Sequence, residues 1–163
     1  MPTDIPEQIH TELETRLEAI TTGNGYSFSV SGVDRVSRDA REWSPKNLGI
    51  GITQPAESRN EQLDHEGNPP ANAYDLLFNL HLFVRQSNDS GTSDQTTENA
   101  FVASVKKAVA NASDWHTFGG LAFNADWGTR QAFIPDEGKH AGATLPLVVQ
   151  YRISETDPFT SRA

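Results

Sequence analysis

Two alternating segments constrain the fold more than any other feature of the sequence. Residues 144–153 are almost entirely apolar on one side and mixed on the other, and residues 75–86 repeat this pattern. Since side chains alternate across a strand, both segments are predicted to be long β-strands with one face on a core. The apolar faces consist of Leu76, Leu80, Leu82, Val84, Leu145, Leu147, Val149, Tyr151, Ile153 and Phe78.

Two other segments have helical spacing. Residues 5–20 form an amphipathic pattern, with Asp4 as the predicted cap and Gly23-Asn24-Gly25 as the predicted stop. Residues 97–112 are predicted to form a second helix, with Ser93 or Asp94 at its start. The apolar stripes of the two helices are Ile5, Ile9, Leu13, Leu17, Ile20, Phe101, Val102, Val105 and Val109.

Shorter strands complete the predicted fold. They are expected at residues 26–30, 48–52, 121–123 and 130–134. The order α-β-β-β-α-β-β-β favours an α+β fold: a single domain over residues 1–163, with a mostly antiparallel sheet flanked by two helices and long polar loops. Gly49 and Gly51 leave one face of the second strand bare, so another backbone can approach it.

Two polar stretches are predicted to be loops. Residues 33–47 contain Arg35, Arg38 and Arg41, the main basic concentration of the chain. Residues 54–73 are rich in proline, acids and amides, and we expect this loop to be extended or mobile.

Composition narrows the classes of function. The chain has 163 residues, of which 36% are hydrophobic, and a formal net charge of −9. Proteins that hold nucleic acid through phosphate contacts need basic patches, so the net charge argues against a protein of that class. The absence of cysteine excludes disulfides, thiolate metal sites and a cysteine nucleophile. Residues 1–4 lack the basic and apolar regions of a signal peptide, so we expect none, and no run approaches the roughly 18 apolar residues of a membrane span. We therefore expect a soluble protein without a membrane partner.

A few polar residues could carry chemistry. Asp64, His65 and Glu66 form a short acid–histidine cluster, and His116 follows Trp115 ahead of a double glycine. No second ligand set stands at a recognised metal spacing, and no nucleophile elbow is present. We expect a solvated loop at residues 64–66 and no catalytic, cofactor or metal site, so the chain is predicted not to be an enzyme.

Eight polar residues are candidates for contacts between subunits. His81 and Arg85 share the mixed face of the long strand and are predicted to be polar-face or interface residues. The arginines at positions 35, 38 and 41 either pair with neighbouring acids or form an intersubunit ion-pair surface. Together with Asp64, His65 and Glu66 they complete the set of interface candidates. A sheet whose second face is half apolar favours a partner, and identical subunits commonly close into rings.

The whole-chain pattern resembles the tail terminator (tail completion, or minor tail) proteins of long-tailed phages. The resemblance covers nearly the full length and rests on the order and spacing of these pieces. They are the helix at 5–20 followed by Gly25-Tyr26, the acidic loop at 55–70, the strand at 76–85, the helix at 101–112, Gly119-Gly120-Leu121-Ala122-Phe123, the closing strand at 147–152 and Asp157-Pro158-Phe159.

The resemblance implies a structural role in the virion, assembled in the host cytoplasm. Family members form a hexameric ring that caps the tail tube, stops its polymerisation and joins the tail to the neck of the filled head. The implied partners are further copies of the chain, the tail tube protein and a neck or head-completion protein, and no cofactor is implied. DNA would pass through the channel without specific binding, which suits an acidic chain. The loop at residues 54–73 is expected to become ordered on contact with a neighbouring ring.

Two other functions remain open at this point. One is a neck adaptor or stopper, which differs in ring position and symmetry. The other is a small metal-dependent hydrolase that uses His65 or His116 with nearby acids.

Overall fold

The chain folds as an α+β protein, as predicted from the order of its elements. The computed structural model describes residues 3–35, 48–67, 70–85, 94–110, 116–133 and 140–161. The helices are α1 (Ile5–Glu18) and α2 (Asp94–Val109), with short 3-10 turns η1 (Thr22–Asn24) and η3 (Glu61–Leu63). The strands are β1 (Gly32–Arg35), β2 (Leu48–Arg59), β3 (Ala71–Arg85), β4 (Asn124–Trp127), β5 (Gln131–Phe133), β6 (His140–Ser154) and β7 (Asp157–Ser161).

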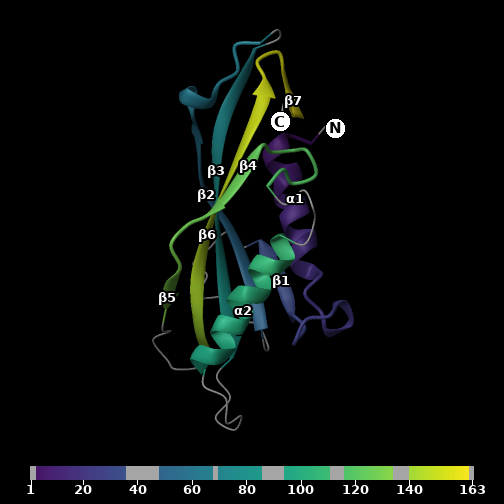
Figure 1. Cartoon of the computed structure of the whole chain (residues 1–163), viewed down its shortest axis with the longest axis vertical. Helices are drawn as coiled ribbons and strands as arrows, with labels where there is room; N and C mark the ends of the chain where they lie inside the picture. Colours follow the sequence, from purple (N-terminus) through teal and green to yellow (C-terminus); the bar gives the residue numbers. More distant parts are fainter. Residues whose placement is uncertain are drawn as a thin grey trace.

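β3 and β6 form the centre of the sheet. Each is 15 residues long, and they pair antiparallel from Ala71 opposite Ser154 to Arg85 opposite His140. β2 pairs antiparallel with β3, and β1 adds to β2 as a parallel strand. β4, β5 and β7 all pair with β6, so the described part of the chain forms one seven-stranded, mostly antiparallel sheet (Figure 1).

Both helices pack on the same face of this sheet. The buried stripes of α1 and α2 form one apolar cluster with Leu76, Phe78, Leu80 and Leu82 of β3. The matching residues of β6 join the same cluster, as the alternating pattern predicts. One face of the sheet is thus the core face. The upper hairpin of β2 and β3 extends beyond the N-terminal end of α1 (Figure 1).

α1 begins with the predicted cap and ends at Glu18 with Ala19 as its C-cap, whereas the predicted stop at residues 23–25 ends the short turn η1 that follows. The Glu7 amide donates to Asp4 Oδ1 over 2.9 Å, which satisfies one of the free N–H groups of the first turn. At the other end, Asn24 Nδ2 donates to the Ala19 carbonyl over 2.9 Å. Gly25 follows with a φ of 79°, a left-handed conformation that favours glycine.

Arg16 joins the two helices at the edge of the core. Its side chain is only 8% exposed; Nε donates to Glu12 Oε1 over 2.8 Å and Nη1 to the Val109 carbonyl over 2.9 Å. Val109 ends α2, so this carbonyl has no helical donor and lies at the negative end of the helix dipole. The guanidinium also lies 4.8 Å from the centre of the Phe118 ring. Arg16 on α1 is therefore a buried cation that donates a hydrogen bond to the last carbonyl of α2.

Pro146 lies inside β6, where a proline normally removes a ladder bond. The N and O atoms of one strand residue point to the same side. The Pro146 carbonyl accepts from the Gly128 amide over 2.8 Å, so its nitrogen faces the gap between β4 and β5 rather than β3. A Cβ atom on Gly128 would lie 2.9 Å from Pro146 Cβ, so the connection passes closely over the proline ring.

Three predicted boundaries are wrong. Residues 26–30 are not a strand, because the amides of Tyr26 and Val30 donate back to Thr21 and Ile20 at the end of α1. The first strand is β1, which begins at Gly32 and continues into the predicted loop at 33–47. Residues 121–123 are likewise not a strand: the turn through Gly119 and Gly120 continues to Ala122, whose amide donates to Thr117, and β4 begins three residues later than predicted.

The predicted loop at residues 54–73 is also corrected. β2 continues to Arg59 and β3 begins at Ala71, with a register shift between Thr53 and Ala56 that accommodates Pro55. A polar composition does not prevent a strand here, because the side chains of residues 54–59 are exposed and need no apolar alternation. The expectation that this segment becomes ordered only on contact with another ring loses its basis.

We expect Arg16→Met to lower the free energy of unfolding by about 2–3 kcal/mol, because the Val109 carbonyl loses its donor in a buried place. Urea unfolding followed by circular dichroism measures the change. Arg59→Met is the matched control, because the Arg59 side chain is 46% exposed and solvent screens its ion pair with Asp64, so we expect a smaller loss of stability. Equal losses in the two variants would contradict the role of Arg16.

We expect Gly128→Ala to lower the free energy of unfolding by about 1–3 kcal/mol, because the new methyl group overlaps the rigid Pro146 ring. Gly32→Ala is the control: a Cβ atom there meets nothing within 4 Å. Thermal unfolding of both variants provides the comparison. A Gly128→Ala protein as stable as the control would show that the connection moves away at no cost.

Candidate interaction surface

α1 and α2 leave the second face of the sheet uncovered in the part of the chain that the structure describes. This face, called the open face below, presents the odd-numbered residues of β3 from Ala73 to Phe83 and the even-numbered residues of β6 from Gly142 to Arg152. Most of its side chains are half-buried. Phe83 is an exception, buried between Gly49 of β2 and Gly142 of β6.

His81 lies at the centre of a polar ladder that crosses the open face. Its Nε2 lies 3.0 Å from Thr53 Oγ1 on β2, and its Nδ1 lies 3.1 Å from Thr144 Oγ1 on β6. Because each hydroxyl can donate or accept, either tautomer of the ring satisfies both contacts. His81 is therefore a polar residue of the second face, as predicted, and it links three strands.

A second ladder crosses the open face nearer the upper hairpin. Asp75 accepts from Asn60 Nδ2 over 3.0 Å and from Gln150 Nε2 over 2.8 Å. Gln150 Oε1 in turn accepts from Asn124 Nδ2 on β4 over 2.9 Å. Both oxygens of the Asp75 carboxylate are occupied, so the most central acid of the open face is held within the sheet.

Between the two ladders lies a patch without charged side chains, formed by Leu77, Asn79, Pro146 and Val148. Leu77 is opposite Val148 and Asn79 is opposite Pro146, and all four are half-buried. Asp126 on β4 borders this uncharged patch beside Val148. Depletion of charge is the compositional signal of protein interfaces, and it stands out in a chain whose net charge is −9.

Arg35, the first interface candidate, pairs within the chain. It donates to Glu7 Oε1 over 2.5 Å, to Glu14 Oε2 over 3.0 Å and to Thr11 Oγ1 over 3.1 Å. Its hydrogen bond to Glu7 lowers the pKa of that carboxyl group. Of the two predicted roles, pairing with neighbouring acids therefore holds for Arg35, which ties β1 to α1. Arg38 and Arg41 lie outside the described residues.

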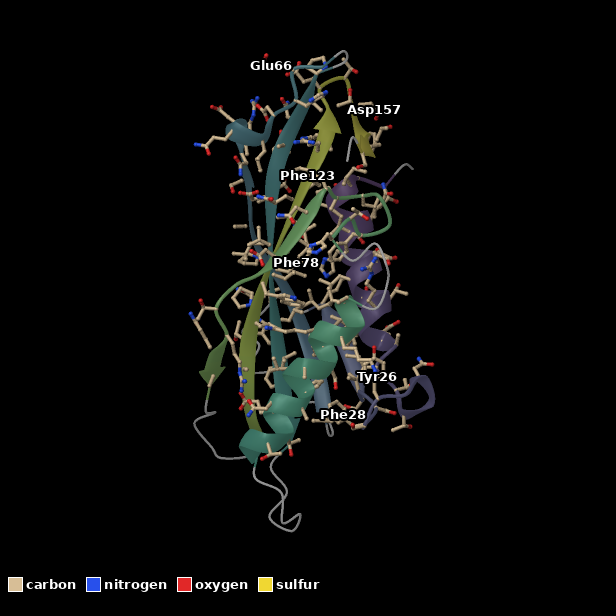
Figure 2. All side chains as sticks on the ribbon, in the orientation of Figure 1. Tyr26, Phe28, Glu66, Phe78, Phe123 and Asp157 are labelled. Atoms are coloured by element: carbon tan, nitrogen blue, oxygen red, sulfur yellow. The ribbon has the colours of Figure 1, made fainter. Side chains whose placement is uncertain are left out.

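The cluster of Asp64, His65 and Glu66 connects β2 to β3. Asp64 accepts from the Ala73 amide over 2.7 Å and from Arg59 Nη2 over 2.9 Å, and these two hydrogen bonds lower its pKa. The backbone of His65 pairs with that of Ala71. Glu66 is exposed at the end of the molecule where Asp157 also lies (Figure 2). Asp64 thus stabilises the hairpin.

The two remaining candidates lie in different places. Arg85 is opposite His140 at the far end of the β3–β6 ladder. His116 donates from Nδ1 to the Ala125 carbonyl over 3.2 Å and so packs against β4. Among the described residues, no group of three or more histidines, cysteines, aspartates or glutamates is placed to hold a metal ion.

Sequence reasoning missed His10, which sits inside the helical stripe of α1. Its side chain is buried, its ring meets Phe78 edge-on at 5.3 Å, and its Nε2 has no hydrogen-bond partner. Burial first, and Arg35 second, lower the pKa of His10, while Glu7, Glu14 and Gln54 oppose this. The position of His10 between Ile9 and Leu13 is the signal that it lies beside the core face of the helix.

The chain was compared with models of known families and with curated proteins, and neither comparison found a match. In the described part of the chain, neither helix combines the length and the apolar character that crossing a bilayer requires.

We expect the free energy of unfolding to fall as the pH drops from 7 to 5. The unfolded His10 binds a proton near pH 6.5, whereas the folded protein resists protonation. The contribution of neutral His10 to the free energy of unfolding is therefore fully present above the unfolded pKa of His10. It is lost as the pH falls through the lowered pKa of the folded state. Urea unfolding at several pH values, compared with His10→Leu, isolates this contribution because the other histidines are unchanged. Parallel pH curves for the two proteins would show that His10 does not contribute.

Proposed function

We propose that this chain is a structural subunit of a phage tail, a tail terminator that forms a six-membered ring at the end of the tail tube. The observation that carries the proposal is the uncharged patch on a sheet whose other face packs against both helices. An acidic chain that stays separate in solution would instead benefit from charges on such a face. Ring closure offers identical subunits a way to cover it.

The order of the elements gives further support. α1, the long strand β3, α2 and the closing strand β6 follow one another as in the pattern on which the family resemblance rests. β7 contains Asp157, Pro158 and Phe159, the last piece of that pattern. The partners proposed with this role are further copies of the chain, the tail tube protein and a neck or head-completion protein.

The net charge suits a ring around a DNA channel. A charge of −9 per subunit lowers the non-specific affinity for DNA, because phosphates are repelled rather than held. DNA could then slide through the ring without binding to it. The proposed location is the virion, at the junction of tail and neck, after assembly in the host cytoplasm.

Native mass spectrometry with negative-stain imaging of the purified chain tests the proposal. We expect six-membered rings with an open centre, in equilibrium with monomers. Twelve-membered rings would instead favour a neck adaptor. A monomer that carries a stoichiometric metal ion, measured by elemental analysis, would overturn the proposal and favour a metal-dependent hydrolase.

A further inference from the structure

Asn24 and Gly25 form the one asparagine–glycine pair in the sequence. Both residues are exposed at the turn η1, which follows α1. A backbone nitrogen attacks a preceding asparagine side chain most readily when it belongs to glycine, because glycine has no side chain to hinder the approach. A Cβ atom on Gly25 would meet nothing within 4 Å, so the described part of the chain leaves this turn open to water.

The chemistry available to this pair needs only water as a co-reactant. The Gly25 nitrogen attacks Asn24 Cγ, so that a new N–Cγ bond forms and the Cγ–Nδ2 bond breaks. The amide proton of Gly25 leaves with Nδ2 as ammonia, and a five-membered succinimide ring remains. Water then opens the ring at either of its two carbonyl groups, which leaves an aspartate or an isoaspartate in place of Asn24.

The folded turn keeps the two reacting groups apart. The Gly25 amide donates to the Thr22 carbonyl over 3.2 Å, and Asn24 Nδ2 donates to the Ala19 carbonyl over 2.9 Å. Closing the five-membered ring requires the Gly25 nitrogen to lie beside Asn24 Cβ, whereas the 3-10 backbone of η1 turns this nitrogen away. The reaction therefore requires η1 to open and to break both hydrogen bonds.

The product of the reaction would not restore the closed turn. Ala19 is the C-cap of α1, and its carbonyl accepts from the Thr21 amide over 2.9 Å as well as from Asn24 Nδ2. A carboxylate at position 24 has no hydrogen to donate. It would also bring negative charge to the negative end of the α1 dipole. The modification therefore favours the open turn.

We propose that Asn24 is a deamidation site that the closed turn η1 protects, and that its modification weakens the connection at the end of α1. The site lies outside the open face, and the inference does not depend on the proposed ring. It concerns the chemistry of one turn.

Peptide mass spectrometry tests the protection. The purified natural chain is kept in mildly alkaline buffer, once without urea and once fully unfolded in urea, and samples are digested with trypsin over time. The expected peptide, residues 17–35, contains Asn24 as its one asparagine and no glutamine, so its mass increase reports this site alone. We expect deamidation to be at least about ten-fold slower without urea, because the folded turn must first break two hydrogen bonds.

Urea unfolding of two variants tests the effect of the product. Asn24→Asp introduces the carboxylate where Asn24 Nδ2 now donates to Ala19. Ser27→Asp is the matched control, because it adds the same charge at another exposed position of the same segment. We expect a lower urea midpoint for Asn24→Asp than for Ser27→Asp, since only the first loses a hydrogen bond and places charge against the end of α1.

The outcomes decide each half of the inference separately from the proposed function. Equal deamidation rates with and without urea would overturn the protection by η1, and an unmodified peptide under both conditions would overturn the site itself. Equal midpoints for Asn24→Asp and Ser27→Asp would overturn the weakening of the connection. None of these results bears on whether the natural chain forms six-membered rings, which native mass spectrometry measures independently.

Discussion

The antiparallel ladder between β3 and β6 determines the rest of the structure. Because both strands keep one register over 15 residues, every apolar residue of the alternating pattern falls on the same face. A slip of one residue would carry Phe78 or Leu147 to the opposite face, so burial under the helices fixes the register. The open face is a consequence of the same ladder, since its residues are those that the register turns away from the core. The register between β3 and β6 therefore determines both the buried core face and the open face that carries the candidate surface.

The features that repeat along the sequence could be predicted, and those that depend on distant partners could not. The helix at Ile5–Glu18 and the two long strands follow from periodicity and caps. The segment at Tyr26 also alternates, yet its amides return to the end of α1, and periodicity does not report where an amide donates. The continuation of β2 to Arg59 was hidden because an exposed hairpin needs no apolar pattern. His81 was placed on the correct face, but its pairing with Thr53 and Thr144 depends on strand order, which the sequence does not encode locally.

The sheet edges are poor sites for adding another strand. Beyond Thr53, β2 has a free edge in the described part of the chain, but it contains Pro55, a register shift, Glu57 and Arg59. Proline, irregularity and charge are the means by which natural sheets prevent edge-to-edge pairing. At the other edge, β4, β5 and β7 are no longer than five residues each. Association through the backbone is thus disfavoured, which leaves faces and side chains as the surfaces for contact.

The distribution of charge is a second, independent reason to expect contacts through the open face. The acids of α1 and the hairpin are either exposed or bound by arginines of the same chain, such as Arg35 and Arg59. These local pairs leave the large negative net charge in place, so an approach of two copies on most surfaces is repulsive. The residues of the uncharged patch add no charge of their own; Asp75, the nearest acid on β3, is held by Asn60 and Gln150, and Asp126 on β4 borders the patch. A polar network that confines a carboxylate within the sheet therefore also prepares the neighbouring apolar residues for contact. The sheet edges disfavour the addition of another strand, and the acidic surfaces of two copies repel each other. Together these two effects favour a contact through the open face.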